Sequence, residues 1–378
     1  MTIRFADTAL LPTALVCAAL LVLAPAARPD TIHTVGGERL QSVTVESESL
    51  AGVVYKPARG AAVTLPIEDV DRIEYERRPA LLDKAAVAVA DGDSATALAI
   101  YREYLSAQVD SSSDTRRFPW AAAYAARRAI ELAHSQRDWD AVGAVTDILV
   151  ANYPDSRHVP AAYLAKADAL ALKGDRAAAG ATLRELSVLV ESKGLAPYFA
   201  LETRLGQAMV GSDLTPTARL TELEKISAEA GSKFPRLFVR SLVARGEALL
   251  QVGFDEPARR DEMITKAREL FERAAATPGA DARSQAGAKT GLAECLFLGA
   301  DSESDKDAIE RARDLYLRVA VLFPDEAQYA PRALFFAGRC FDLLGGENDR
   351  QRAQRLYGEV IRLYPGTPWA EEARNQRR

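Results

Sequence analysis

An acidic run near residue 300 carries carboxylates at the spacing that a cation site would need. Asp301–Asp307 has an acidic residue at every second position, as in the ligand order of a calcium-binding loop. Lys306 stands where such a loop needs a glycine for its sharp turn, and Ala312 stands where it needs a bidentate glutamate. The run therefore predicts a solvated turn that caps the following helix, and no metal site.

The other residue types that bind metals or attack substrates are few and dispersed. His33, His134 and His158 stand in different parts of the chain, and none has a metal-ligand spacing to a cysteine. The sequence contains neither a glycine-rich phosphate loop ending in Lys-Ser/Thr nor a Gly-x-Ser-x-Gly turn. We therefore predict a protein that is not an enzyme and needs no cofactor.

Composition and charge restrict the classes of partner. Of 378 residues, 48% are hydrophobic and 27% are charged, which is typical of a folded soluble protein. The net charge of −5 is spread along the chain, whereas a phosphate-binding face needs a concentrated basic stripe. We therefore expect no nucleic acid partner.

The N-terminus has the pattern of an export signal. Arg4 precedes an apolar run over residues 9–23, and the small residues 24–27 follow it. The run is shorter than the roughly 20 residues of a membrane-spanning helix, and Ala-x-Ala is typical of a signal-peptidase site. We predict a signal peptide over residues 1–27 and a periplasmic or secreted protein with no membrane span after cleavage; an uncleaved N-terminal anchor is the alternative. Cys17 lies inside the apolar run, which disfavours lipidation.

Residues 31–76 alternate between apolar and polar side chains with a period of two, which predicts strands. Five short strands in one small segment can close into a barrel, because closure removes exposed edges. We predict a small five-stranded β-barrel domain over 31–76, which resembles SH3-like or Sm-like barrels. The segment lacks the basic, aromatic-rich face that RNA-binding barrels use, so a docking or capping module is the favoured interpretation.

From residue 80 to residue 378 the apolar pattern is helical, and the unit Pro331–Pro365 is the clearest example. It contains two amphipathic runs that are too short to be stable alone, so we expect them to pair as a helical hairpin. Gly338 and Ala353 stand where the two helices must approach closely, and Tyr357 stands where the gap between them must be filled.

The same spacing recurs in seven units, although Glu222 and Lys225 occupy the large positions of the fourth, which is degenerate. The small residues of the two helices in each unit are Ala85 and Ala97, Ala129 and Ala141, Ala167 and Ala179, Gly206 and Ala218, Gly246 and Ala267, Gly291 and Ala312, and Gly338 and Ala353. Successive second-helix alanines lie 38 to 49 residues apart, which exceeds the repeat of about 34 residues in strict tetratricopeptide repeats (TPRs). The pattern predicts a mostly α protein with about seven TPR-like hairpins over 80–378, and a last helix at Trp369 that caps them.

The repeat resembles the TPR family. Aromatic-Pro pairs end the second helix at Tyr153, Phe323 and Tyr364. Together with the export signal, this makes the chain similar to periplasmic TPR proteins of Gram-negative envelopes, including outer-membrane assembly lipoproteins and the Tol-Pal cell-division coordinator. The resemblance implies a right-handed α-solenoid and a groove that binds proteins. The absence of a lipid-site cysteine and the N-terminal barrel depart from these proteins.

The two cysteines that follow the predicted signal are Cys295 and Cys340, each on the first helix of a predicted unit. An oxidising compartment would allow a disulfide between them. Cysteine also serves as a small buried filler, which is the interpretation we favour.

The first helices of a TPR solenoid line its concave face, so their exposed positions are the candidate binding residues. The predicted partner-binding residues are Val243, Leu250, Leu292, Arg332, Phe335, Arg339 and Asp342. This face could hold a partner helix, or a tighter superhelical twist could fill it. We expect an exported scaffold that binds envelope proteins or peptides through the groove; the alternative is an accessory protein that binds cell-wall glycan or peptide.

Overall fold

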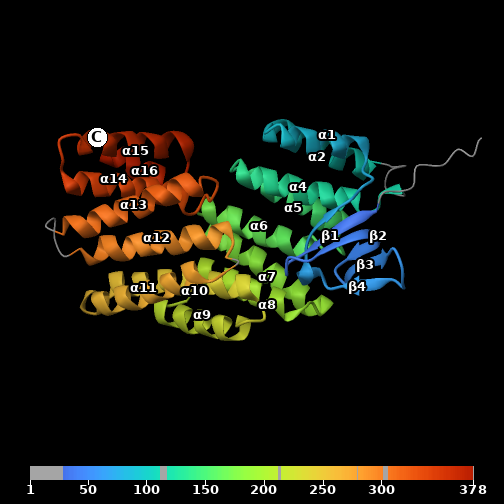
Figure 1. The fold of residues 1–378 in the computed structure, drawn as a ribbon, viewed down its shortest axis with the longest axis horizontal. Coiled ribbons are helices and arrows are strands. Elements are labelled where there is room, and N and C mark those ends of the chain that lie inside the picture. The colour runs from blue at the N-terminus through green and yellow to red at the C-terminus, as the bar shows by residue number, and fades with distance from the viewer. Residues whose placement is uncertain (1–28, 111–116, 212–213, 279, 301–304, 378) are drawn as a thin grey trace, which may run out of the picture.

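The computed structural model describes residues 29–110, 117–211, 214–278, 280–300 and 305–377. The predicted signal peptide, including Cys17, lies outside the described residues, as do residues 301–304 of the acidic run. In the described part of the chain, a small sheet lies beside the N-terminal half of a long stack of helices (Figure 1).

The N-terminal sheet is antiparallel and open. It consists of β1 (Asp30–Thr34), β2 (Arg39–Ser49), β3 (Gly52–Pro57), β4 (Val63–Leu65) and β5 (Val70–Glu74), with the 3-10 helix η1 (Ile67–Asp69) before β5. The strand order is β4-β3-β2-β1-β5, so the edge strands β4 and β5 do not pair. The predicted closed barrel is therefore wrong, although the five strands are confirmed. The sheet packs against the helices instead of closing on itself.

One face of the sheet is buried against the helical part of the chain. Its core consists of Ile32, Val43, Val53, Val70, Ile73 and Tyr75, and Trp120 and Tyr124 from the helical part pack against this core. The alternation of buried and exposed side chains that predicted the strands is thus the consequence of one face meeting helices rather than a second sheet.

The described helices form seven hairpins and one unpaired final helix. The first helices are α1 (Ala80–Ala90), α4 (Ala121–Ser135), α6 (Val159–Leu172), α8 (Pro197–Val210), α10 (Pro235–Asp255), α12 (Ala282–Gly299) and α14 (Ala330–Leu344). The second helices are α2 (Ser94–Asp110), α5 (Trp139–Asn152), α7 (Arg176–Lys193), α9 (Pro216–Ala230), α11 (Arg260–Ala276), α13 (Lys306–Leu322) and α15 (Asp349–Leu363), and the final helix is α16 (Pro368–Gln376). The 3-10 helix η2 (Pro257–Arg259) precedes α11. Each predicted pair of small residues falls on the two helices of one hairpin.

Each helix packs on the next one in the chain, and from α4 onward the first helices also contact one another. This order of neighbours is that of repeated helical hairpins, and Figure 1 shows the stack turning so that the first and last hairpins lie at the same side of the molecule. We interpret the fold as an α-solenoid; its right-handed twist remains a prediction.

Local signals set the helix ends. Asp138, Asp175 and Asp305 each accept a hydrogen bond at the start of α5, α7 and α13, which satisfies amide groups that have no partner inside the helix. Asp305 therefore plays the capping role predicted for the acidic run. Tyr153 and Tyr364 follow the last residues of α5 and α15, because the proline after each cannot continue a helix.

Glycines on first helices make room for aromatic rings on second helices. A Cβ atom added at Gly338 would lie 2.6 Å from Cε1 of Tyr357, and one added at Gly246 would lie 2.6 Å from Cε1 of Phe271. A Cβ at Gly291 would meet the same Phe271 ring from the other side. The small-to-large pattern of the sequence thus corresponds to rings seated over helix backbones.

Both cysteines are free and buried in the hydrophobic core. Burial raises the pKa of each thiol to about 12. Cys295 and Cys340 act as fillers in this structure. No helix among the described residues is both long enough and apolar enough to cross a membrane.

Replacing Gly246 with alanine should destabilise the protein by about 1–3 kcal/mol, because the methyl group would overlap the buried Phe271 ring. Gly143 is the matched control: it also lies inside a helix, but its added Cβ would meet nothing within 4 Å. Gly143→Ala should stabilise by about 0.5–1 kcal/mol, because alanine loses less backbone entropy than glycine. Chemical denaturation followed by circular dichroism measures both. Equal effects would contradict the role assigned to Gly246.

Candidate functional site

The predicted groove residues are mostly core residues. Val243, Leu250 and Phe335 are only 3%, 8% and 4% exposed. Val243 and Leu250 belong to a cluster around Phe271, which Leu292 joins as a partly buried member. Phe335 belongs to a different cluster and packs against Tyr357 and Trp369. Contact between successive first helices buries these positions, so they offer little surface to a partner.

The polar members of the predicted set are not gathered on one surface either. Arg332 is half-buried and forms an ion pair with Glu294, while Arg339 is half-buried and Asp342 is exposed. Asp342 accepts a hydrogen bond of 2.6 Å from the hydroxyl of Tyr357. These side chains hold the C-terminal hairpins together.

Arginine–carboxylate pairs join first helices to one another. We call the face of the stack that the first helices form its inner face. Arg240 on α10 donates to both oxygens of Glu202 on α8, at 2.7 and 2.6 Å. Arg283 on α12 donates to both oxygens of Asp168 on α6, at 3.1 and 2.6 Å. In the Arg283–Asp168 pair two guanidinium nitrogens each meet one carboxylate oxygen, the planar fork that arginine favours; in the Arg240–Glu202 pair one nitrogen contacts both oxygens. Polar contacts between first helices therefore cross the inner face.

Of these two pairs, Arg283–Asp168 joins the helices that lie farther apart in the sequence. Asp168 also lies 2.9 Å from Nε2 of His134 on α4, and Arg283 donates to Gln328 as well. Burial by itself would raise the pKa of the Asp168 carboxyl, but the charge of Arg283 and the hydrogen bonds from His134 and Arg283 hold that pKa well below its usual value. The carboxylate is thus ionised and joins three first helices.

The turn after α4 also reaches the last hairpins. Arg137 donates to the backbone carbonyls of Leu363, at 3.1 Å, and Pro324, at 3.2 Å. Its guanidinium lies 4.3 Å from the centre of the Tyr364 ring. The aromatic-Pro turns that end α13 and α15 therefore receive a side chain from an early hairpin. These contacts narrow the space that the predicted groove would occupy.

The sheet is fixed to the helices by a second group of contacts. The Tyr75 ring stacks on Trp120 with centroids 3.5 Å apart. Glu48 on β2 accepts hydrogen bonds from Tyr75 and from Arg157, and the Arg157 side chain is 8% exposed. Because Glu48 and Arg157 are both buried, each neutralises a charge that would be costly alone. The sheet is therefore anchored to the turn before α6 and to the start of α4.

A cleft of about 450 Å³ remains open between β5 and the helices. It is lined by β5 and by residues from α4, α6, α8 and α10. Tyr75, Tyr124, Tyr198 and Phe199 form its aromatic part. Six arginines line it as well: Arg72, Arg78, Arg127, Arg128, Arg157 and Arg236. We call this space the arginine cleft.

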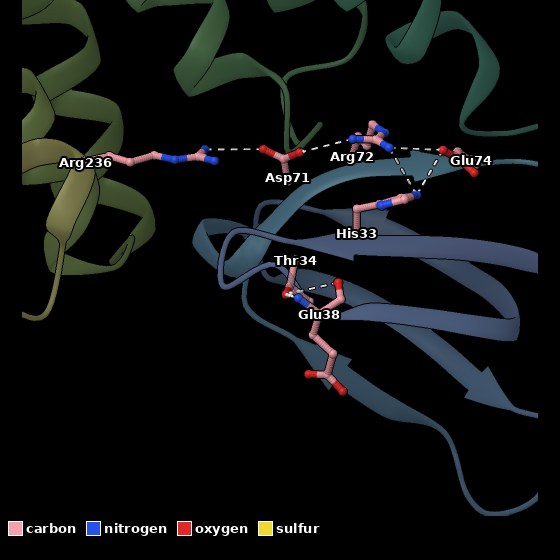
Figure 2. Close-up of polar contacts among 7 residues, drawn as sticks. All are labelled: His33, Thr34, Glu38, Asp71, Arg72, Glu74 and Arg236. Carbon is pink, nitrogen blue, oxygen red and sulfur yellow. Dashed lines mark hydrogen bonds and ion pairs between the residues drawn. The ribbon is translucent and has the colours of Figure 1, made fainter. Parts of the chain in front are cut away.

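One end of the arginine cleft is a network along β5. Figure 2 shows Arg236 reaching Asp71 from α10, and Arg72 lying between Asp71 and Glu74. The corresponding N–O distances are 3.3 Å for Arg236–Asp71, 3.7 Å for Arg72–Asp71 and 3.3 Å for Arg72–Glu74. His33 lies 2.9 Å from Glu74. Burial by itself would raise the pKa of the Glu74 carboxyl, but the Arg72 hydrogen bond and the charges of His33, Arg72 and Arg39 together lower it.

A second arginine pair lies on α4. Arg127 and Arg128 both contact Glu131, at 2.8 and 2.5 Å. The Nε atom of Arg128 is buried and has no hydrogen-bond acceptor among the described residues. His158 lines the same cleft; burial, and then the positive charges of Arg157 and Arg127, hold its pKa well below the usual value. The cleft thus keeps His158 neutral while its arginines are charged.

Sequence reasoning missed the arginine cleft. Its arginines come from β5, from the start of the helical part and from three separate helical hairpins, so no local basic run marks them. The inner-face pairs left a weak signal: Arg240, Arg283 and Arg332 each lie on the first helix of consecutive units.

No family model matches the chain, and no curated protein matches it. Among solved structures, the chain is similar to the S. pombe nuclear import adaptor Nro1, a hypoxic regulator of sterol synthesis, with 13% identity, 78% of this chain and 91% of that chain covered, and a TM-score of 0.24. A circular tandem repeat protein with novel repeat topology matches with 17% identity, 78% of this chain, 65% of that chain and a TM-score of 0.19. Similarity at these scores carries no conclusion about this protein.

Asp168→Asn should lower the free energy of unfolding by about 2 kcal/mol, because it leaves the Arg283 guanidinium without its counter-charge. Asp147→Asn is the control. Asp147 also forms an ion pair, at 2.6 Å from Lys166, but its side chain is 66% exposed. That change should cost less than about 0.5 kcal/mol. Chemical denaturation compares them, and equal costs would show that the inner-face pair adds no more than a surface pair.

Stability should fall on acidification because of His158. The unfolded chain binds a proton at this residue near pH 6.5, whereas the folded protein resists protonation to well below that pH. The contribution is therefore fully present above about pH 6.5 and is lost as pH falls towards the lowered pKa. When the pH falls from about 7.5 to about 5.5, the free energy of unfolding of the wild type should decrease by about 1.4 kcal/mol more than that of His158→Gln. Parallel pH curves in denaturation experiments would refute this.

Proposed function

We propose that this protein is a non-enzymatic scaffold that binds partner proteins, and that the arginine cleft is its recognition site. The observation that carries the proposal is the contrast between two surfaces. Arg240–Glu202 and Arg283–Asp168 cross the inner face of the stack and leave a space of only about 280 Å³ beside them. The cleft beside β5 is larger, at about 450 Å³, and lies in the volume range of binding pockets.

The rigidity of the cleft walls supports this choice. One wall is a sheet that is anchored by the Tyr75–Trp120 stack and the buried Glu48–Arg157 pair. The other wall is formed by first helices that also pack on one another. A preformed site loses little conformational entropy on binding. Arginine and tyrosine are also the side chains that contribute most at protein interfaces.

From the export-signal pattern over residues 1–27, we propose that the scaffold acts in the bacterial envelope, with envelope proteins or peptides as partners. Recognition of cell-wall glycan is less favoured. Stacking on sugars needs a free aromatic face, but Trp120 stacks on Tyr75 and Trp369 packs against Phe335.

Site-specific photo-cross-linking tests the proposal. A benzophenone amino acid is placed at Val35, which lines the cleft and is 39% exposed. The matched control is Val188, which is 65% exposed on α7 and outside the cleft. With the full chain expressed in its native host, Val35 should give a discrete cross-linked protein that mass spectrometry identifies and that the purified pair reproduces.

The control decides the interpretation. Cross-linking at Val188 to the same protein, with none at Val35, would place the binding surface elsewhere. Fractionation of the same cells tests the predicted location, because a cytoplasmic protein would contradict export.

A further inference from the structure

Two arginines converge on one carboxylate at two separate places in the arginine cleft. Arg72 and Arg236 both contact Asp71, and Arg127 and Arg128 both contact Glu131. Arg72 also contacts Glu74, which Arg39 reaches as well. Arginines therefore outnumber carboxylates at each place. A guanidinium carries five N–H donors, so each place has donors left for a carboxylate of a ligand.

The charge of the cleft differs from that of the whole protein. Of the six arginines that line the cleft, Arg157 and Arg78 are already paired with Glu48 and Asp83, which lie outside the lining. The local excess of positive charge comes from two places: Arg127 and Arg128 share Glu131, and Arg39, Arg72 and Arg236 share Asp71 and Glu74. Glu68 is the one further carboxylate of the lining, and the chain as a whole has a net charge of −5. A concave site between low-dielectric walls concentrates such an excess. The aromatic side chains between the arginine groups offer apolar contact as well. A ligand with spaced carboxylates and apolar groups between them matches this surface.

The edge of β5 is poorly suited to pairing with a ligand strand. His33 pairs with Arg72 and Thr34 pairs with Val70, so Asp71 is an extra residue in β5. Such a bulge disrupts the hydrogen-bonding ladder at a sheet edge. Recognition in the cleft would therefore depend on the side chains of Arg72 and its neighbours rather than on the strand backbone.

We propose that the arginine cleft binds an acidic peptide segment of the partner protein, in which carboxylates flank apolar residues. This inference rests on the proposed function and adds the chemistry of the partner. Nucleic acid fits less well, because a phosphate backbone binds a continuous basic stripe, whereas here each arginine pair already holds a carboxylate and the two pairs come from different elements.

Fluorescence anisotropy with the full chain tests the inference. The probes are a short fluorescein-labelled peptide in which glutamate alternates with leucine, the same peptide with lysine in place of glutamate, and a single-stranded oligo-dT of similar length. The glutamate peptide should bind, its affinity should fall as salt rises, and the lysine peptide should not bind.

Charge reversal locates the binding. Arg72→Glu with Arg236→Glu changes side chains that are 58% and 47% exposed. The control is Arg352→Glu with Arg259→Glu, which are also 58% and 47% exposed and also form ion pairs, but lie outside the cleft. The cleft double variant should bind the glutamate peptide about tenfold more weakly, and the control should stay within about twofold of the wild type.

Arg72→Gln with Arg236→Gln is a second variant that removes the charges without reversing them, and it should give a smaller loss. Circular dichroism confirms that each variant is folded. Equal weakening in cleft and control variants, or oligo-dT binding as tight as the glutamate peptide, would overturn the inference. If the glutamate peptide does not bind while Val35 still cross-links to its partner, the proposed function stands and the acidic-segment inference fails.

Discussion

The carboxylate of Asp168 links parts of the chain that the helical repeats alone would not bring together. Repeated hairpins fix only the contact between neighbours. Asp168 on α6 contacts His134 on the neighbouring first helix, α4, and Arg283 on α12, which lies three hairpins further along the chain. An ionised carboxylate in this position is costly to bury unless it is paired on both sides. Once it is paired, Asp168 and Arg283 cross the inner face of the stack.

The turn after α4 also contacts the last hairpins. Arg137 reaches the carbonyls of Pro324 and Leu363, so an early hairpin and the last ones are held to each other. The surface that TPR-like proteins usually offer to partners is thereby reduced. The candidate binding surface is instead the arginine cleft, which lies where the sheet meets the stack.

The sheet has two roles in this arrangement. Its buried face packs on the start of α4 through Trp120 and Tyr124, and Leu50 and Ile67 pack against residues of α7 and α8. Its edge strand β5 also supplies Asp71, Arg72 and Glu74 to the cleft. The β element thus supplies a wall of the candidate site, because it packs beside the stack and places its edge next to the first helices.

Arginine–carboxylate contacts occur both on the inner face and in the arginine cleft, but in different ratios. On the inner face, arginines and carboxylates pair one to one, as in the bidentate Arg283–Asp168 pair. In the cleft, two arginines share one carboxylate, as at Glu131. The first arrangement is complete and stabilises the fold. The second leaves donors for a ligand, which is the physical reason for assigning recognition to the cleft.

The sequence by itself determined the local structure. Period-two alternation predicted the strands, and small residues such as Gly338 opposite large ones such as Tyr357 predicted the hairpins and their pairing, because these signals act between residues close in the chain. Only the tertiary structure decided that the sheet stays open, that Val243 and Phe335 are core residues, and that the cleft exists. These features depend on residues far apart in sequence, such as Arg236 with Asp71 and Arg283 with Asp168, and no local spacing encodes their meeting.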